Sequence, residues 1–139
     1  MAERLRNVKT ISRIERALKN AASAEKGNVA CIDTADGSLV PGAVSATLVP
    51  IGYFEDTLVG DGVTLIGVTL FAEIECAVMI NSSVGPVADS DMLKTTYLHS
   101  SFEVSMTATG KSALGRVWGV IGSGAGAKVL VQTTVAGAP

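Results

Sequence analysis

The stretch VTLIGVTLFAEIECAVMI, residues Val63–Ile80, decides the fold, because every even-numbered position from Ile66 onward is apolar. Strict period-two alternation is the pattern of a β-strand with one buried face. Its 18 residues exceed an ordinary strand of about five or six. The sequence therefore predicts a bend near Gly67 or Ala72, or two strands joined through a corner, with the rest of the chain pairing with this stretch or packing on it.

Further short β patterns follow one another along most of the chain. An Asp36-Gly37 turn joins two runs into a hairpin, Pro50 places its own strand at an edge or a bulge, and apolar and polar residues alternate over Phe102–Ala108. About six to eight short strands at this spacing predict an all-β fold, a small antiparallel β-barrel or sandwich. We find no internal repeat in the sequence, so a single β domain is expected over residues 27–139.

Residues 1–26 are predicted to form a basic N-terminal arm. They contain seven Lys or Arg residues against three acids, a net charge of +4, whereas residues 27–139 carry −6. Ser12 and Glu15 fit a capping box, which favours a short helix from about Arg13 to Glu25 with an apolar face too narrow to fold alone. Such an arm is expected to order on an acidic partner. The predicted contact residues are Arg4, Arg6, Ile11, Arg13, Ile14, Arg16 and Leu18.

The composition predicts a surface that a partner completes. Charged residues make up 17% and apolar residues 47% of the chain, and so little charge usually leaves apolar surface for another protein to cover. No long apolar run lacks charge and the N-terminus lacks a signal-peptide pattern, so neither a membrane span nor secretion is expected. Cys31 and Cys76 are predicted to be buried free thiols on strands, and a disulfide within or between chains is the alternative.

No catalytic, cofactor or metal site is predicted. The run Gly122-Ser-Gly-Ala-Gly126 is similar to a dinucleotide loop, but too few residues follow it for the required helix and second strand, so a hairpin loop is expected. His99 is the only histidine and has no Cys or acid spaced to share a metal. The chain is therefore not expected to be an enzyme.

Three segments in order carry a resemblance to a known family. They are KGNVACIDTADGSLVPG (Lys26–Gly42), LVPIGYFEDTLVGDGVTLIGVTLFAEI (Leu48–Ile74) and YLHSSFEVSMTATGKSALGRVWGV (Tyr97–Val120). A Lys-Gly before the first strand, an Ile-Gly strand, and a Tyr strand followed by Leu114-Gly-Arg-Val117 resemble the head decoration, or capsid cement, proteins of tailed bacteriophages.

This resemblance implies a compact β protein without enzymatic activity or cofactor. It would be made in the host cytoplasm and located on the outer surface of the virion, commonly as a homotrimer. Its partner would be the major capsid protein, whose subunits it would bridge, and no membrane or direct nucleic-acid contact is implied. Two alternatives stay open: another virion subunit, such as a head-completion or tail-tube protein, and a nucleic-acid-binding β-barrel that uses the basic arm.

Overall fold

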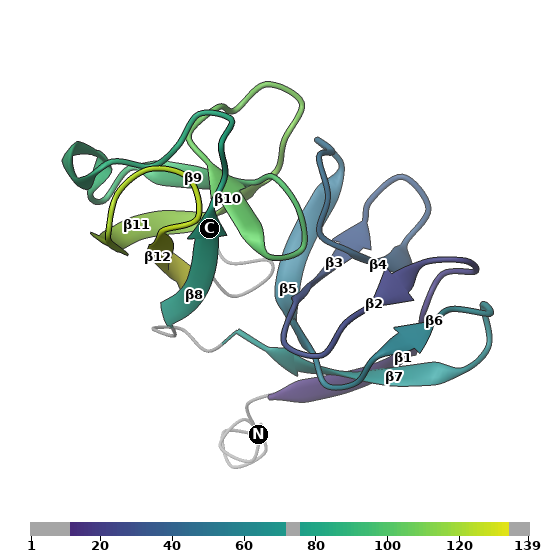
Figure 1. Cartoon of the computed structure of the whole chain (residues 1–139). Helices are drawn as coiled ribbons and strands as arrows, with labels where there is room; N and C mark the ends of the chain where they lie inside the picture. The colour runs from purple at the N-terminus through teal and green to yellow at the C-terminus, as the bar shows by residue number, and fades with distance from the viewer. Residues whose placement is uncertain (1–11, 72–75, 134–139) are drawn as a thin grey trace, which may run out of the picture.

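The computed structural model describes residues 12–71 and 76–133, and these form an all-β structure (Figure 1). The predicted fold class is confirmed, with twelve strands and one short 3-10 helix in the described residues instead of six to eight strands. The elements are β1 (Arg13–Ala17), β2 (Ser23–Ala24), β3 (Val29–Asp33), β4 (Ser38–Pro41), β5 (Leu48–Phe54), β6 (Leu58–Val59), β7 (Leu65–Leu70), β8 (Cys76–Asn81), η1 (Asp89–Asp91), β9 (Thr95–Leu98), β10 (Glu103–Ser105), β11 (Ala113–Ile121) and β12 (Lys128–Thr133).

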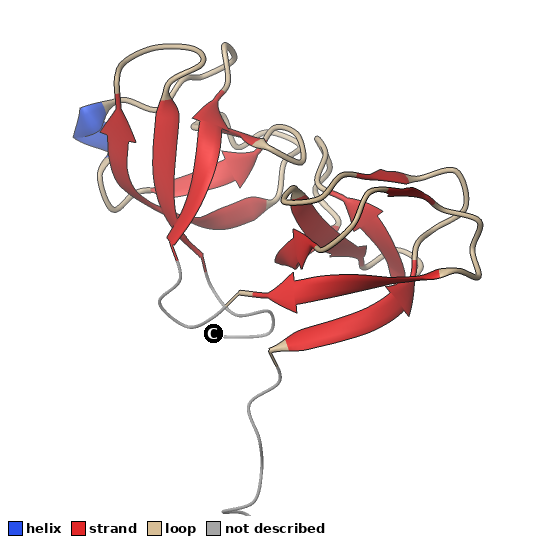
Figure 2. Cartoon of the chain, turned by 60° about the horizontal axis from the view of Figure 1, so that its bottom comes forward, coloured by secondary structure: helices blue, strands red, loops and turns tan. Residues whose placement is uncertain are grey.

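The strands gather into two lobes that lie side by side (Figures 1 and 2). Lobe 1, residues 13–70, contains the five-stranded sheet β1-β7-β5-β3-β4 and the small ladder β2-β6. Lobe 2, residues 76–133, contains β10-β8-β12-β11-β9, whose pairings close into a ring. In lobe 1 a single parallel bridge between Leu18 and Leu39 links the two edges of the sheet.

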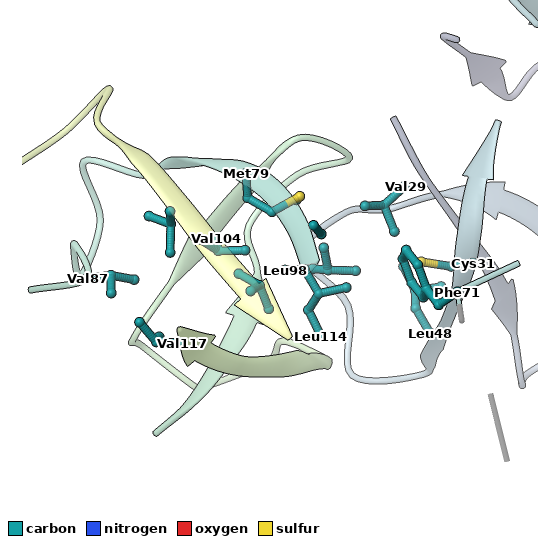
Figure 3. Close-up of a cluster of buried hydrophobic side chains, with 13 residues drawn as sticks. Val29, Cys31, Leu48, Phe71, Met79, Val87, Leu98, Val104, Leu114 and Val117 are labelled. Atoms are coloured by element: carbon teal, nitrogen blue, oxygen red, sulfur yellow. The ribbon is translucent and has the colours of Figure 1, made fainter. Parts of the chain in front are cut away.

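Two clusters of buried side chains hold this arrangement together. One fills lobe 1. The other fills lobe 2 and continues into the junction, where the outer face of β3 and β5 packs against lobe 2 (Figure 3). The lobe 1 cluster is Leu18, Ala24, Ala30, Leu39, Ile51, Phe54, Ile66 and Val68. The shared cluster is Val29, Cys31, Leu48, Phe71, Ala77, Met79, Val87, Leu98, Val104, Leu114, Val117, Val129 and Val131.

Hydrogen bonds also cross the junction between the lobes. The Ser112 hydroxyl accepts from the Leu48 N–H at 3.2 Å and donates to the Ser45 carbonyl at 2.5 Å. The Val29 N–H donates to the Ser101 carbonyl at 2.8 Å. These bonds satisfy polar groups that the apolar junction would otherwise bury without partners.

The stretch Val63–Ile80 is divided between the lobes as β7 and β8, which confirms the prediction of two strands. However, the buried positions do not keep the same parity along the whole stretch. Ile66 and Val68 are buried in lobe 1, but in β8 the buried positions are Ala77, Met79 and Asn81. The phase changes because each strand faces the core of its own lobe, so even-numbered positions of β8 lie on the surface.

The helix expected over Arg13–Glu25 is wrong, because the structure has strands β1 and β2 there. β1 pairs antiparallel with β7, and β2 pairs with β6. Ile14 packs against the lobe 1 core and Leu18 is fully buried in it. The edge of β7 therefore supplies both backbone partners and apolar burial, which a lone helix with a narrow stripe lacks. Residues 12–26 belong to lobe 1, and residues 1–11 lie outside the described part of the chain.

The two lobes repeat one topology, although no repeat is visible in the sequence. The five main strands are, in chain order, β1, β3, β4, β5 and β7 in lobe 1 and β8, β9, β10, β11 and β12 in lobe 2. In each lobe the first of these pairs with the fifth, the fifth with the fourth, the fourth with the second, and the second with the third, all antiparallel. In both lobes the third strand returns to the first in parallel. Lobe 2 is thus a second copy of the strand arrangement of lobe 1.

Register and irregularities repeat as well. Gly52 faces Leu70 and the equivalent Gly115 faces Thr133, each 63 positions later in the chain. A β-bulge lies just before Gly52 in the pairing of β5 with β3, and another lies just before Gly115 in the pairing of β11 with β9. At both glycines a Cβ atom would collide with a backbone carbonyl of the facing strand. The close approach explains why glycine stands at this position in both lobes.

Candidate docking face

The outer surface of β8, β12 and β11 in lobe 2 carries a continuous apolar patch, here called the apolar face. Val78 faces Leu130, which faces Gly119, and Ile80 faces Lys128, which faces Ile121. A bulge between Val117 and Gly119 adds Trp118 beside Leu130. The face consists of Val78, Ile80, Trp118, Ile121 and Leu130.

Three of these side chains are exposed to solvent, and Ile80 and Leu130 are half-buried. Val78 and Ile121 are each 59% exposed and Trp118 is 48% exposed. Single exposed apolar residues are ordinary, but several on adjacent strands mark a contact surface. Burying the remaining area of these three side chains would stabilise a complex by about 1 kcal/mol each. Their sum, about 3 kcal/mol, corresponds to roughly a hundredfold in affinity.

At the equivalent positions of lobe 1, charged side chains pair with one another within the chain. Sixty-three positions before Val78, Leu130 and Trp118 stand Glu15, Gly67 and Glu55. There the Arg13 guanidinium bonds both carboxylate oxygens of Glu55, the shortest contact being 2.7 Å, and lies 3.2 Å from Glu15. The Thr69 hydroxyl also donates to Glu55, at 2.9 Å.

This polar network is self-contained. Hydrogen bonds from Arg13 and then Thr69 lower the pKa of the Glu55 carboxyl, and the bond to Glu55 raises the pKa of Arg13. Gly67 leaves room for this network, because a Cβ there would displace the Glu55 carboxylate and the Arg13 guanidinium. At the equivalent positions of lobe 2, Val78 and Trp118 stand in place of Glu15 and Glu55. In the next row the contrast is reversed, because lobe 1 exposes Leu65 where lobe 2 has Lys128.

The rim of the apolar face is basic. Arg116 and Lys128 are exposed on β11 and β12, and neither makes an ion pair with any residue that the structure describes. An apolar centre with unpaired cations at its edge is complementary to a protein surface that carries apolar residues and carboxylates.

A strained backbone lies at the edge of the apolar face. Leu93 has a φ of 66°, in the left-handed region, and its N–H donates to the Val117 carbonyl at 2.7 Å. In lobe 1 the equivalent bond runs from Gly27, with a φ of 87°, to Phe54. A left-handed conformation costs a non-glycine residue about 1–2 kcal/mol. In lobe 2 the residue in this conformation is Leu93, not a glycine, and its side chain is 51% exposed beside β11.

The predicted contact residues of the N-terminal arm are used within the chain where the structure describes them. Arg13 is held by Glu55, and the Arg16 guanidinium donates to the Gly37 carbonyl at 2.6 Å. Ile14 is half-buried and Leu18 fully buried in the lobe 1 core. The described residues therefore do not form a free basic stripe. Outside the described part of the chain lie Arg4, Arg6 and Ile11.

The two cysteines differ in environment. Both lie on strands with free thiols. Cys31 is fully buried at the junction between the lobes, and burial raises the pKa of its thiol to about 12. Cys76 is exposed, contrary to the expectation of burial, because it lies on the outer face of β8.

The structure also places the other motifs that the sequence analysis considered. They contain no group of three or more His, Cys, Asp or Glu residues placed to hold a metal. His99 is half-buried, with its Nδ1 atom unpartnered. Gly122–Gly126 forms the turn between β11 and β12, as predicted for a hairpin loop. No helix in the described ranges is long and apolar enough to cross a bilayer.

Sequence reasoning missed the apolar face. It assigned Val78 to the buried side of its strand, because Val78 has the same parity as the buried Ile66 and Val68. A usable signal was present in β11, where Val117, Trp118, Val120 and Ile121 place apolar residues on both faces. A strand that is apolar on both faces is covered on both, by its own core or by a partner.

Comparison with known proteins gave no relative of this chain. No protein-family model, no curated protein and no solved structure matched it. The functional conclusion therefore depends on the apolar face and on the resemblance noted in the sequence.

Proposed function

We propose that this protein is a structural virion component, a decoration protein that binds the outer surface of a phage head and stabilises contacts between major capsid subunits. The observation that carries the proposal is the apolar face with its unpaired basic rim, set against a polar, internally paired surface at the same place in lobe 1. A protein that binds only the assembled lattice shifts the equilibrium toward the intact shell.

The geometry favours a binding role over the other functions considered. A nucleic-acid-binding barrel needs a basic track with aromatic side chains for stacking. Of the arm cations within the described residues, Arg13 pairs with Glu55 and Lys19 with Asp36. The exposed Trp118 lies among aliphatic side chains on the apolar face, an arrangement that suits protein contact.

The class is tested by the protein content of purified particles from the virus that encodes the chain. A decoration protein is expected at a copy number near that of the major capsid protein, measured by quantitative mass spectrometry. Absence from the particles, or only a few copies, would reject the proposal. A stable hexameric ring of the isolated chain would instead favour a tail-tube or head-completion subunit.

The docking face is tested separately with surface variants. The double variant Val78→Ser/Trp118→Ser is expected to lose binding to undecorated heads by about tenfold or more, since it removes roughly 2 kcal/mol of interfacial burial. The control Val59→Ser/Val63→Ser changes two apolar residues of lobe 1 that are more exposed than Val78 and Trp118, and it is expected to bind normally. Equal binding by both variants would exclude the apolar face as the contact.

The proposal includes a homotrimer around three-fold positions of the shell, because closed symmetric assemblies are the usual way to repeat one contact. A density map of decorated heads checks it. Single copies at the centres of hexamers would contradict this part alone.

A further inference from the structure

A second difference between the lobes concerns the two loops at one end of each barrel. In lobe 1 the loop between β1 and β3 contains β2, and the loop between β5 and β7 contains β6. These loops pair, with Ser23 facing Val59 and Ala24 facing Leu58. Beyond the ladder, the Gly60 N–H donates to the Ala22 carbonyl at 2.7 Å. The loops thus close that end of lobe 1.

The equivalent loops of lobe 2 do not pair. Between Pro86–Asp89 and Val120–Gly124 they enclose a pocket of about 180 Å³. The residues 63 positions after Leu58 and Val59 are Ile121 and Gly122. Gly122 lines the pocket, and Ile121 pairs with Lys128 of β12 on one side but with no described strand on the other. Lobe 2 therefore has an opening where lobe 1 has a two-stranded ladder.

A buried asparagine binds the backbone of one of the two loops at the opening. Asn81 stands at the position of Leu18 and is 1% exposed. Its side-chain amide donates to the Val87 carbonyl at 2.9 Å, and its amide oxygen accepts from the Val87 N–H at 2.7 Å. The N–H and carbonyl of Val87 are thereby both bonded to a side chain.

The β11–β12 loop retains the backbone groups that a strand would use. Ser123 corresponds to Gly60, whose N–H and carbonyl bond Ala22 and Ala21. Within the described residues, neither the N–H nor the carbonyl of Ser123 has a protein partner. Asp89, at the mouth of the pocket, is exposed and makes no ion pair with a described residue.

We propose that this pocket accepts an extended segment of a partner protein, which adds to Ile121–Ser123 as a short β-strand in the way that β2 adds to β6. The chemistry of the occupant follows from its counterpart. Ala24 of β2 is buried against lobe 1, so the incoming strand presents a small apolar side chain to the pocket. A neighbouring Lys or Arg pairs with Asp89. Main-chain hydrogen bonds give affinity in this mode, and the pocket selects the side chain. This site adjoins the apolar face at Ile121, which belongs to both, and it does not depend on the proposed function.

The test uses the full-length ¹⁵N-labelled protein and a synthetic peptide with the sequence of residues 20–27, NAASAEKG, which contains β2. Titration is expected to give saturable amide shifts confined to the loops 86–89 and 120–124, with slowed hydrogen exchange at Ser123. A peptide in which the alanine equivalent to Ala24 is replaced by proline is the control, and it is expected to bind at least tenfold more weakly.

Two protein variants sharpen the result. Ser123→Pro removes the N–H needed for pairing and is expected to abolish the shifts, whereas Ser123→Ala keeps the N–H and is expected to bind as the parent does. Absence of saturable shifts with the parent protein would overturn the proposal. Shifts that map to Val78 and Trp118 would also overturn it, because they would show adsorption to the apolar face.

Discussion

Replacing Asn81 by leucine is predicted to destabilise the protein, even though leucine is the residue at the equivalent position of lobe 1. The substitution removes both hydrogen bonds to Val87, at 2.7 and 2.9 Å, and leaves a donor and an acceptor unpaired where Val87 is only 2% exposed. Each unsatisfied buried group costs about 1–3 kcal/mol. The leucine regains about 1–2 kcal/mol through apolar burial. The net expectation is a loss of about 1–4 kcal/mol.

Urea denaturation gives the free energy of unfolding of Asn81→Leu, and hydrogen exchange reports the Val87 amide directly. The variant is expected to unfold at lower urea and to exchange that amide faster. Asn20→Leu is the matched control, because Asn20 is exposed and its side chain makes no hydrogen bond with a described residue; it should stay within about 0.5 kcal/mol of the parent. A change below about 1 kcal/mol in Asn81→Leu, with the Val87 amide still protected, would refute the role assigned to this asparagine.

Three further predictions concern single positions. Gly115→Ala should destabilise by about 1–3 kcal/mol in thermal unfolding, since its Cβ would meet a carbonyl of β12, while Gly119→Ala, where the nearest atom is 3.9 Å away, should cost under 1 kcal/mol. In the folded protein Cys76 should react with iodoacetamide and Cys31 should not. Burial raises the pKa of the Cys31 thiol from about 9 to about 12. The stability that the buried neutral thiol contributes is therefore complete below about pH 9 and is lost as pH rises toward 12. Leu93→Gly should unfold within about 1 kcal/mol of the parent, because relief of left-handed strain offsets lost burial, yet it should bind heads more weakly.

The β class was readable in the sequence because it depends on local pattern. Period-two alternation predicted β7 and β8, the Asp36-Gly37 turn gave the β3–β4 hairpin, and Pro50 indicated the bulge that follows it in β5. The expected helix failed for a non-local reason. Its capping signal is a weak local preference, and the open edge of β7 offers the same residues backbone partners and burial together.

The repeated topology and the docking face could not be predicted in this way. Equivalent strands share few residues, such as Gly52 with Gly115 and Val68 with Val131, so the repeat exists in pairing and register more than in sequence. The exposed side of β8 depends on which core the strand faces, and parity alone could not assign Val78. Low charge predicted exposed apolar surface, but only the pairing of three strands shows where the apolar face lies.

The order in which the lobes are synthesised has a consequence for the junction between them. Each lobe is continuous in the chain, so a ribosome completes lobe 1 before residues 76–133 exist. At about 5–20 residues per second, those 58 residues take about 3–12 s to emerge. Throughout that interval the outer face of β3 and β5, with Val29, Leu48 and the Cys31 thiol, has no lobe 2 to cover it. The nascent chain is then most open to aggregation and to thiol oxidation, and a translational pause inside lobe 2 would lower the yield of folded protein more than the same pause inside lobe 1.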